Sequence, residues 1–231
     1  GGQNVYFAKD GAFTGETSLS MAKSVGATFA LVGHSERREL FGETDELVGL
    51  KTRAILDAGL VAVVCIGESK EQYDGGLVRD VCGEQLAGAL QNVSAEEIAS
   101  GKVVIAYEPV WAIGTGLTAT PAIAQSVHAF IRGWTRDTFG DAAADAVVIQ
   151  YGGSVKPDNA ATIFAISDVD GALVGGTGVE LPVRLGLRRF AGVSRRVAGR
   201  RSALGVTARL LPISPGGGRI ASRVRGLRVG P

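Results

Sequence analysis

Residues 103–116 read VVIAYEPVWAIGTG, and this stretch decides how the rest of the chain is interpreted. Residues 103–107 are apolar without alternation, which is typical of a β-strand covered on both faces in a parallel sheet. A carboxylate, Glu108, follows the apolar run directly and precedes a proline. The stretch therefore predicts a buried strand that presents an acidic side chain at its carboxyl end.

Apolar runs of this kind recur along the chain, and longer helical patterns separate them. Strands are predicted over residues 28–32, 60–66, 103–107, 147–151 and 171–174, and helices over residues 45–58, 81–90, 122–139 and 159–165. The alternation of strands with helices indicates βαβ units and a parallel sheet.

Each predicted strand ends in polar or glycine-rich residues. These ends are Gly33-His34-Ser35-Glu36, Gly67-Glu68, Glu108-Pro109, Gly152-Gly153-Ser154 and Gly175-Gly176. Active sites of parallel α/β proteins lie at the carboxyl edge of the sheet. Because several strands contribute to one site, a βα barrel is favoured over a doubly wound sheet.

The composition predicts one soluble, folded unit. The chain has 231 residues, of which 45% are hydrophobic and 20% are charged, enough for one hydrophobic core. Its longest apolar stretches are strand-sized, shorter than a membrane span, and no basic-then-apolar leader opens the chain. Two cysteines, Cys65 and Cys82, lack the spacing of disulfide frameworks or metal sites, so we expect reduced thiols and a cytoplasmic location.

Charge divides the sequence near residue 181. Residues 1–181 carry all 23 acidic residues and 12 of the 24 basic ones, whereas residues 182–231 carry 12 arginines with no lysine and no acid. We therefore separate a partial barrel, residues 1–181, from an Arg/Gly-rich tail, residues 182–231, that is disordered or translated out of frame. The rival interpretation is a functional polycation that binds nucleic acid or an anionic surface, although Phe190 is its only aromatic residue.

Eight strings, in order and at matching spacing over residues 1–176, resemble the triosephosphate isomerase family. They are QNVY (3–6), GAFTGE (11–16), GHSERR (33–38), FGE (41–43), CIGE (65–68), AYEPVWAIGTG (106–116), YGGS (151–154) and DVDGALVGG (168–176). The resemblance implies a TIM (βα)8 barrel and an isomerase that interconverts dihydroxyacetone phosphate and D-glyceraldehyde 3-phosphate in glycolysis and gluconeogenesis. It implies neither a metal nor a cofactor. The alternative, another phosphate-binding βα barrel, would keep the glycine loops but has no use for His34 and Glu108.

The resemblance assigns the two catalytic roles. Glu108 is implied as the base that removes a carbon-bound proton, and His34 as a neutral electrophile that polarises the carbonyl. Taken without its motif, a glutamate such as Glu108 is usually a solvated loop carboxylate, and a histidine such as His34 is usually a helix cap or a surface residue. His128 has no motif around it, so we interpret it as a cap or surface residue. Ser35 and Glu36 are given supporting roles beside His34.

A lid, a phosphate site and a dimer loop are also implied. The lid consists of Pro109, Val110, Trp111, Ala112, Ile113, Gly114, Thr115 and Gly116, whose apolar body could close over a small substrate and exclude water. Phosphate is expected to be held by the backbone N–H groups around Gly114, Ser154, Gly175 and Gly176 rather than by side-chain charge. Thr14 lies at the tip of the loop through which family members form a homodimer.

The chain departs from the family pattern at both ends. We expect it to lack strands one and two, most of strand three and the lysine of strand one, and to carry an aberrant segment after about residue 177 in place of helix eight. Losing a preorganised cation at developing negative charge costs several kcal/mol of transition-state stabilisation. The chain is therefore either an isomerase of the family or, alternatively, a barrel fragment that is inactive for lack of the lysine and whose basic tail binds nucleic acid or an anionic surface.

Overall fold

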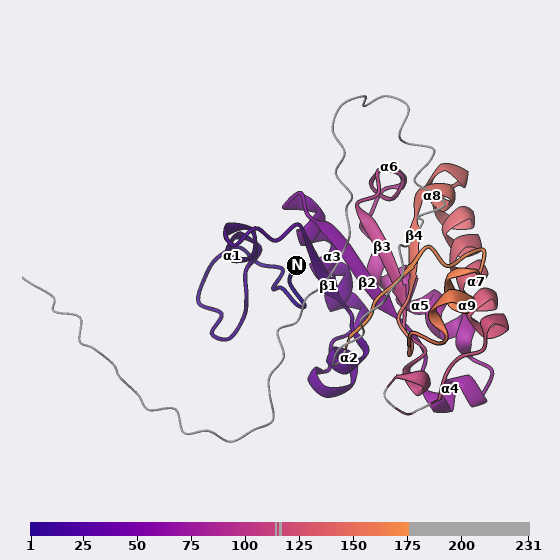
Figure 1. Ribbon diagram of the computed structural model, residues 1–231. Coiled ribbons are helices and arrows are strands. Elements are labelled where there is room, and N and C mark those ends of the chain that lie inside the picture. Colours follow the sequence, from indigo (N-terminus) through magenta and orange to yellow (C-terminus); the bar gives the residue numbers. More distant parts are fainter. Residues whose placement is uncertain (114, 116, 176–231) are drawn as a thin grey trace, which may run out of the picture. The chain divides into compact units, whose positions relative to one another are not determined.

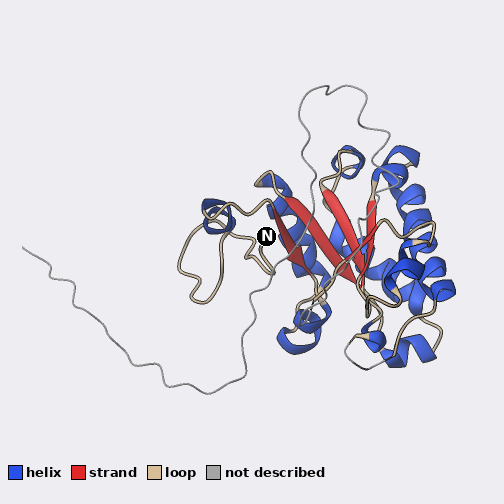
Figure 2. Cartoon of the chain, viewed as in Figure 1, coloured by secondary structure: helices blue, strands red, loops and turns tan. Residues whose placement is uncertain are grey.

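The computed structural model describes residues 1–113, 115 and 117–175 of the chain (Figure 1). Five parallel strands form one sheet, and each strand pairs with its neighbour in sequence (Figure 2). The strands are β1 (Phe29–Val32), β2 (Val61–Ile66), β3 (Val103–Tyr107), β4 (Val148–Tyr151) and β5 (Gly171–Ala172). The helices are α1 (Leu19–Ser24), α2 (Ser35–Phe41), α3 (Asp45–Asp57), α4 (Lys70–Asp74), α5 (Val78–Leu90), α6 (Ala95–Ala99), the 3-10 turn η1 (Val110–Ala112), α7 (Pro121–Phe139), α8 (Asp141–Ala146) and α9 (Ala160–Phe164).

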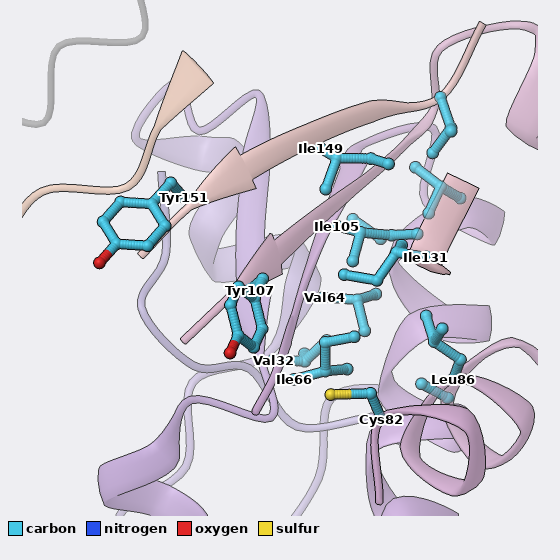
Figure 3. Close-up of a cluster of buried hydrophobic side chains, with 14 of the residues drawn as sticks. Val32, Val64, Ile66, Cys82, Leu86, Ile105, Tyr107, Ile131, Ile149 and Tyr151 are labelled. Atoms are coloured by element: carbon cyan, nitrogen blue, oxygen red, sulfur yellow. The ribbon is translucent and has the colours of Figure 1, made fainter. Parts of the chain in front are cut away.

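The two faces of the sheet bury different partners. Alternate strand residues on one face pack against the helices, and Figure 3 shows this core between the strand residues Val64, Ile105 and Ile149 and the helical residues Leu86 and Ile131. The opposite face carries a smaller cluster with no helical residue, namely Leu31, Val63, Cys65 and Ala106 with Phe29 and Val104 from the strands and Leu173, which follows β5. Helices on one face and strand side chains on the other are the arrangement of a barrel wall, whereas a doubly wound sheet carries helices on both faces.

The sequence predicted every strand to within a few residues, and the sheet register explains why. β2 and β3 pair residue for residue from Ala62 with Val103 to Ile66 with Tyr107, so both are covered by neighbouring strands as well as on both faces. β5 is shorter than predicted, at two residues rather than four. The N–H of Leu173 still donates to the carbonyl of Tyr151 at 3.0 Å, so the chain keeps its direction beyond the end of the strand.

The helices begin and end at residues that satisfy their free backbone groups. The hydroxyls of Thr44 and Thr120 accept the N–H groups of Leu47 and Ile123 at the starts of α3 and α7, and Pro121 occupies the first position of α7. Gly59, at φ +77°, follows the end of α3 in the left-handed region, as predicted from the sequence.

A buried arginine joins α7 to the segments that lead into β4 and β5. Arg132 is 4% exposed and forms ion pairs with Asp168 at 2.8 Å and Asp170 at 2.7 Å. It also donates to the carbonyls of Ala144 and Val147. This network fixes the approach to β4 and β5, whose carboxyl ends lie at the candidate site.

The predicted boundary near residue 181 and the whole tail, residues 182–231, lie outside the described residues. Within the part of the chain that is described, no helix is both long and apolar enough to cross a bilayer.

Candidate active site

The carboxyl ends of the strands meet at one edge of the sheet, where main-chain hydrogen bonds hold the following loops together. The N–H of Glu108 donates to the carbonyl of Ile66 at 2.7 Å, and the N–H of Gly152 donates to the carbonyl of Tyr107 at the same distance. Loops that begin while still bonded to a neighbouring strand have little freedom. The side chain of Glu108 is therefore placed by the sheet itself.

His34 occupies the N-cap position of α2. Its ring nitrogen Nδ1 accepts the N–H of Glu36 at 3.3 Å, which satisfies one of the free donors at the start of the helix. A nitrogen that accepts a hydrogen bond carries no proton, so this bond assigns the proton of the neutral ring to Nε2. The helix start therefore selects the tautomer and leaves Nε2–H free to donate toward the site.

Glu108 and His34 are in direct contact. Glu108 Oε1 lies 3.1 Å from His34 Nε2, and Oε2 accepts the N–H of Ser35 at 2.9 Å. The carboxylate is nearly buried, since Glu108 is 2% exposed. Burial raises the pKa of Glu108, and the charge interaction with His34 and the hydrogen bond from Ser35 partly offset this rise. A buried carboxylate of raised pKa beside a donating imidazole can accept a proton from a weak acid.

Glycines on either side allow the backbone to approach Glu108 closely. A Cβ on Gly67 would lie 1.7 Å from the carbonyl oxygen of Glu108, and one on Gly152 would lie 2.8 Å from Glu108 Cγ. Distances below about 3 Å between such atoms require the structure to shift. The glycines at the ends of β2 and β4 are therefore needed for the close approach of the backbone to Glu108.

The lid region begins as a 3-10 turn that is anchored from below. Trp111 and Ala112 are buried, and Trp111 Nε1 donates to Glu68 Oε1 at 2.7 Å. The hydroxyl of Tyr107 donates to the same oxygen at 3.0 Å. Burial raises the pKa of Glu68, and the hydrogen bonds from Trp111 and Tyr107 oppose the rise. The apolar body predicted for the lid is thus packed down by a buried carboxylate.

The sequence did not assign a role to Glu68, although it placed this residue at a strand end. It also did not assign one to Glu43, whose carboxylate accepts the N–H of Gly33 at 3.0 Å and pairs with Lys51 and Arg37. Burial acts to raise the pKa of Glu43, but the contacts with Lys51, Gly33 and Arg37 outweigh burial and lower it. The only sequence feature that could have pointed to Glu43 is its place in the FGE string, residues 41–43.

Arg38 is a further residue near the site that the sequence analysis did not assign a role. Arg38 Nε donates to the carbonyl of Gly33 at 2.7 Å, and its guanidinium also donates to the carbonyl of Cys65 at 3.3 Å and pairs with Asp45. It therefore joins the carboxyl ends of β1 and β2 directly beneath His34. Cys65 itself is buried, and burial raises the pKa of its thiol, which agrees with an inert core residue.

The remaining predicted residues are distributed as follows. Ser154 follows β4 and is half-buried, with its carbonyl accepting the side-chain N–H of Asn159, and Gly175 is exposed beyond β5 with open space where a Cβ would lie. Thr115 donates its hydroxyl to the carbonyl of Trp111 at 2.7 Å. Gly114, Gly116 and Gly176 lie outside the described residues.

Thr14 lies in an exposed turn of the N-terminal loop. The loop is closed at its base by a hydrogen bond from the N–H of Tyr6 to the carbonyl of Thr17, and the rings of Tyr6 and Phe13 pack at 4.6 Å between centroids. The carboxylate of Glu36, expected to support the site, is largely exposed, whereas the backbone N–H of Glu36 makes the contact with His34.

A parallel sheet with helices on one face, and an acid and a histidine paired at its carboxyl edge, define an α/β-barrel enzyme of acid–base chemistry. Comparison with known proteins agrees with this class. The family model described as Triosephosphate isomerase matches residues 1–186. The chain belongs to the triosephosphate isomerase family, a family of glycolytic isomerases.

Several curated relatives named triosephosphate isomerase are similar over most of the chain. The protein of Herpetosiphon aurantiacus is 50% identical over 190 residues, which cover 82% of this chain and 75% of the relative. That of Chlorobium phaeovibrioides is 49% identical over 178 residues, covering 77% and 70%, respectively. That of Chloroflexus aurantiacus is 51% identical over 180 residues, covering 78% and 71%.

Proposed function

We propose that this chain interconverts dihydroxyacetone phosphate and D-glyceraldehyde 3-phosphate, in glycolysis and in gluconeogenesis, with Glu108 as the base and His34 as the electrophile. The observation that carries the proposal is the pairing of Glu108 Oε1 with His34 Nε2 at 3.1 Å, with the ring tautomer selected by the start of α2. The family membership supplies the class of substrate.

The two side chains divide the chemistry of an aldose–ketose isomerisation. The Glu108 carboxylate takes a proton from the hydroxymethyl carbon of the ketose while His34 Nε2–H donates to the neighbouring carbonyl oxygen. Negative charge that develops on that oxygen is stabilised by the donor, and the product of this step is an enediol or enediolate. Glu108 then returns the proton to the other carbon, while the hydroxyl proton of the former hydroxymethyl oxygen passes by way of His34 Nε2 to the former carbonyl oxygen, which gives the aldose and restores the carboxylate.

Burial suits Glu108 to this task. A carboxylate in water is too weakly basic to remove a proton from carbon at a useful rate, and burial raises the pKa of Glu108. The carboxylate must leave His34 before the substrate can lie between the two groups. This movement separates Glu108 Oε1 from His34 Nε2 and breaks the hydrogen bond from the N–H of Ser35 to Oε2, while the side chains of Ser35 and Cys65 also face the carboxylate.

The lid and the glycine loops complete the proposal. Ser154, Gly175, Gly176 and Gly114 hold the phosphate group, and residues 109–116 close over the intermediate. Exclusion of water protects an enediolate phosphate from losing its phosphate group in a side reaction.

We also propose a homodimer in the cytoplasm, with Thr14 at the contact between subunits. The exposed turn that carries Thr14 and the exposed Phe13 beside it support this assembly. The free cysteines Cys65 and Cys82 support a reducing compartment.

The experiment that tests the catalytic assignment follows the carbon-bound proton directly. Dihydroxyacetone phosphate is incubated with the protein in D2O, and the exchange of its carbon-bound protons is followed by 1H NMR. Glu108→Asp withdraws the carboxylate by one methylene and should slow exchange by about 10²-fold, the cost of a displacement of about 1 Å. His34→Gln should slow it by about 10²–10³-fold, as loss of one preorganised donor does elsewhere.

The matched control is Glu39→Asp, the same change at an exposed position of α2. This variant should exchange protons at the parent rate. Exchange at the parent rate in Glu108→Asp or His34→Gln, or no exchange in the parent chain, would contradict the proposal.

A further inference from the structure

Tyr73, which packs against Trp111, lines a small cavity that has no role in the proposed isomerase chemistry. This cavity has a volume of about 190 Å³ and is lined by residues of α4, the start of α5 and α7. It is lined by Tyr73, Val78, Arg79, Ile123, Ser126 and Val127. The volume is below the roughly 300 Å³ at which pockets for drug-sized ligands begin, so it suits a smaller molecule.

The walls of the cavity are apolar and firmly placed. Ile123 and Val127 are spaced four residues apart on α7, so they share one face of the helix, and Ile123, Val78 and Tyr73 all pack against the main core. Val127 is itself buried. The apolar lining therefore belongs to the folded core and exists without a ligand, as preformed binding sites do.

The rim of the cavity carries a positive charge that has no carboxylate partner. Arg79 lies over the ring of Phe130, 5.8 Å from its centroid, and forms no ion pair within the described part of the chain. This is unusual for its surroundings, because acidic residues outnumber basic ones by 23 to 12 in residues 1–181. The ring fixes the guanidinium at the mouth of an apolar cavity, where it can donate to an anion.

The cavity is connected to the lid by one aromatic contact. The ring of Tyr73, which lines the cavity, packs on the ring of Trp111 with centroids 4.4 Å apart. Trp111 in turn donates its indole N–H to Glu68. A ligand that presses on Tyr73 therefore acts on the same side chain that holds the lid to the end of β2.

We propose that this cavity is a regulatory site for a small carboxylate with a branched aliphatic body, bound through Arg79 and held against Tyr73. The apolar body fills the space between Val78, Ile123 and Val127, and the carboxylate meets the guanidinium. Occupancy holds Tyr73 against Trp111 and so favours the arrangement in which Trp111 is bonded to Glu68. Binding at the cavity is independent of the proposed function, whereas its effect on turnover rests on the lid having the role given above.

Binding is tested with isovalerate as the probe on the full chain, by NMR of isoleucine methyl groups. The Ile123 methyl signal should shift in a saturable manner, and Arg79→Gln should weaken isovalerate at least about tenfold, because hydrogen bonds to charged groups contribute about 1.5–3 kcal/mol. Isoamyl alcohol, which has the same body and no charge, should bind Arg79→Gln and the parent chain equally. The matched control is Arg136→Gln, an arginine of α7 that pairs with Asp141 away from the cavity.

The connection to the lid is tested in the same titration through the indole N–H signals. The Trp111 signal should move with the Ile123 signal, while Trp134, seven residues beyond Val127 on α7 and about 10 Å along its axis, should not. Tyr73→Leu should retain the Ile123 shift and abolish the Trp111 shift. Circular dichroism confirms that each variant is folded.

The binding site, its connection to the lid and the proposed function can each be contradicted by a different result. Absence of a saturable Ile123 shift, or an isovalerate affinity unchanged by Arg79→Gln, overturns the site. A Trp111 shift that survives Tyr73→Leu overturns the connection to the lid. Failure of the Glu108 and His34 variants to affect proton exchange would overturn the proposed function while leaving the isovalerate result intact.

Discussion

Trp111 donates its indole N–H to the buried carboxyl group of Glu68 at 2.7 Å, so the 3-10 turn η1, where the proposed lid begins, is tied to the end of β2 by a hydrogen bond. The same oxygen accepts the hydroxyl of Tyr107, the last residue of β3. Glu68 Oε1 therefore connects the end of β2 to both the end of β3 and η1.

Replacing this acceptor should loosen the lid and weaken the fold. Glu68→Leu leaves Trp111 Nε1 and the Tyr107 hydroxyl without their partner, and each buried donor left unpaired costs about 1–3 kcal/mol. We expect a lower free energy of unfolding in urea and a red shift of tryptophan fluorescence. Glu71→Gln, on the exposed side of α4, should leave the unfolding midpoint unchanged. Equal midpoints for the two variants would show that the hydrogen bonds to Glu68 contribute nothing.

His128, expected from the sequence to be a cap or surface residue, is instead buried in α7, and it should make the protein less stable in mild acid. Burial lowers the pKa of His128 from 6.5 to about 4, so the unfolded chain takes up a proton at a higher pH than the folded chain does. The stabilising contribution is present above pH 6.5 and is lost as the pH falls from about 6.5 toward 4. Between pH 7 and pH 5 this loss amounts to about 2 kcal/mol.

The variant His128→Gln isolates this contribution, because the remaining titrating groups are shared with the parent. The difference in free energy of unfolding between variant and parent, measured by urea denaturation at several pH values, should shift in favour of the variant as the pH falls. A difference that is constant from pH 7 to pH 5 would rule out His128 as the source.

Replacing Arg132 should lower the free energy of unfolding strongly, because this arginine is buried. Arg132→Met withdraws the cation that faces Asp168 and Asp170, and breaking a buried ion pair from one side costs about 3–5 kcal/mol. Arg136→Met, one turn further along α7 and largely exposed, should cost less than about 1 kcal/mol. Chemical denaturation of both variants measures the contrast, and similar losses for the two would contradict it.

Two glycines should respond to alanine with opposite signs. At Gly67 the new methyl group would meet the carbonyl of Glu108, and we expect at least about 2 kcal/mol of destabilisation together with slower proton exchange. At Gly133, inside α7, a Cβ has no neighbour within 4 Å, and alanine should stabilise the protein by about 0.5–1 kcal/mol. Thermal unfolding of the two variants would expose an error in either sign.

The strands and the longer helices were predictable because their signals are local. An unbroken apolar run marks a strand buried on both faces, and thirteen or more residues of helical pattern mark α3 and α7. α1, α4, α6 and α8 are five or six residues long and were not predicted, whereas α9, also of five residues, was predicted within residues 159–165. Hydrogen bonds that close a capping box, as at Ser69 and Ser94, fix α4 and α6.

The candidate site was predictable to the extent that its residues lie at strand ends. Glu108 and His34 follow apolar runs directly, and the structure brings the two together across 74 residues of sequence. The supports behind them were not predictable in this way. Glu68 meets Trp111 across 43 residues and Arg132 meets Asp168 across 36, and no spacing rule links such pairs before the sheet is assembled.

The cap at the start of α2 narrows the routes by which this protein could be stabilised or could change in evolution. A helix start is usually improved by serine, threonine or aspartate, whose oxygens accept the same backbone N–H that His34 Nδ1 accepts. Here any such improvement deletes the ring that faces Glu108. Selection for a more robust fold and selection for the chemistry therefore act on one atom in opposite directions, and a library screened only for thermal stability would enrich for variants that no longer have the proposed activity.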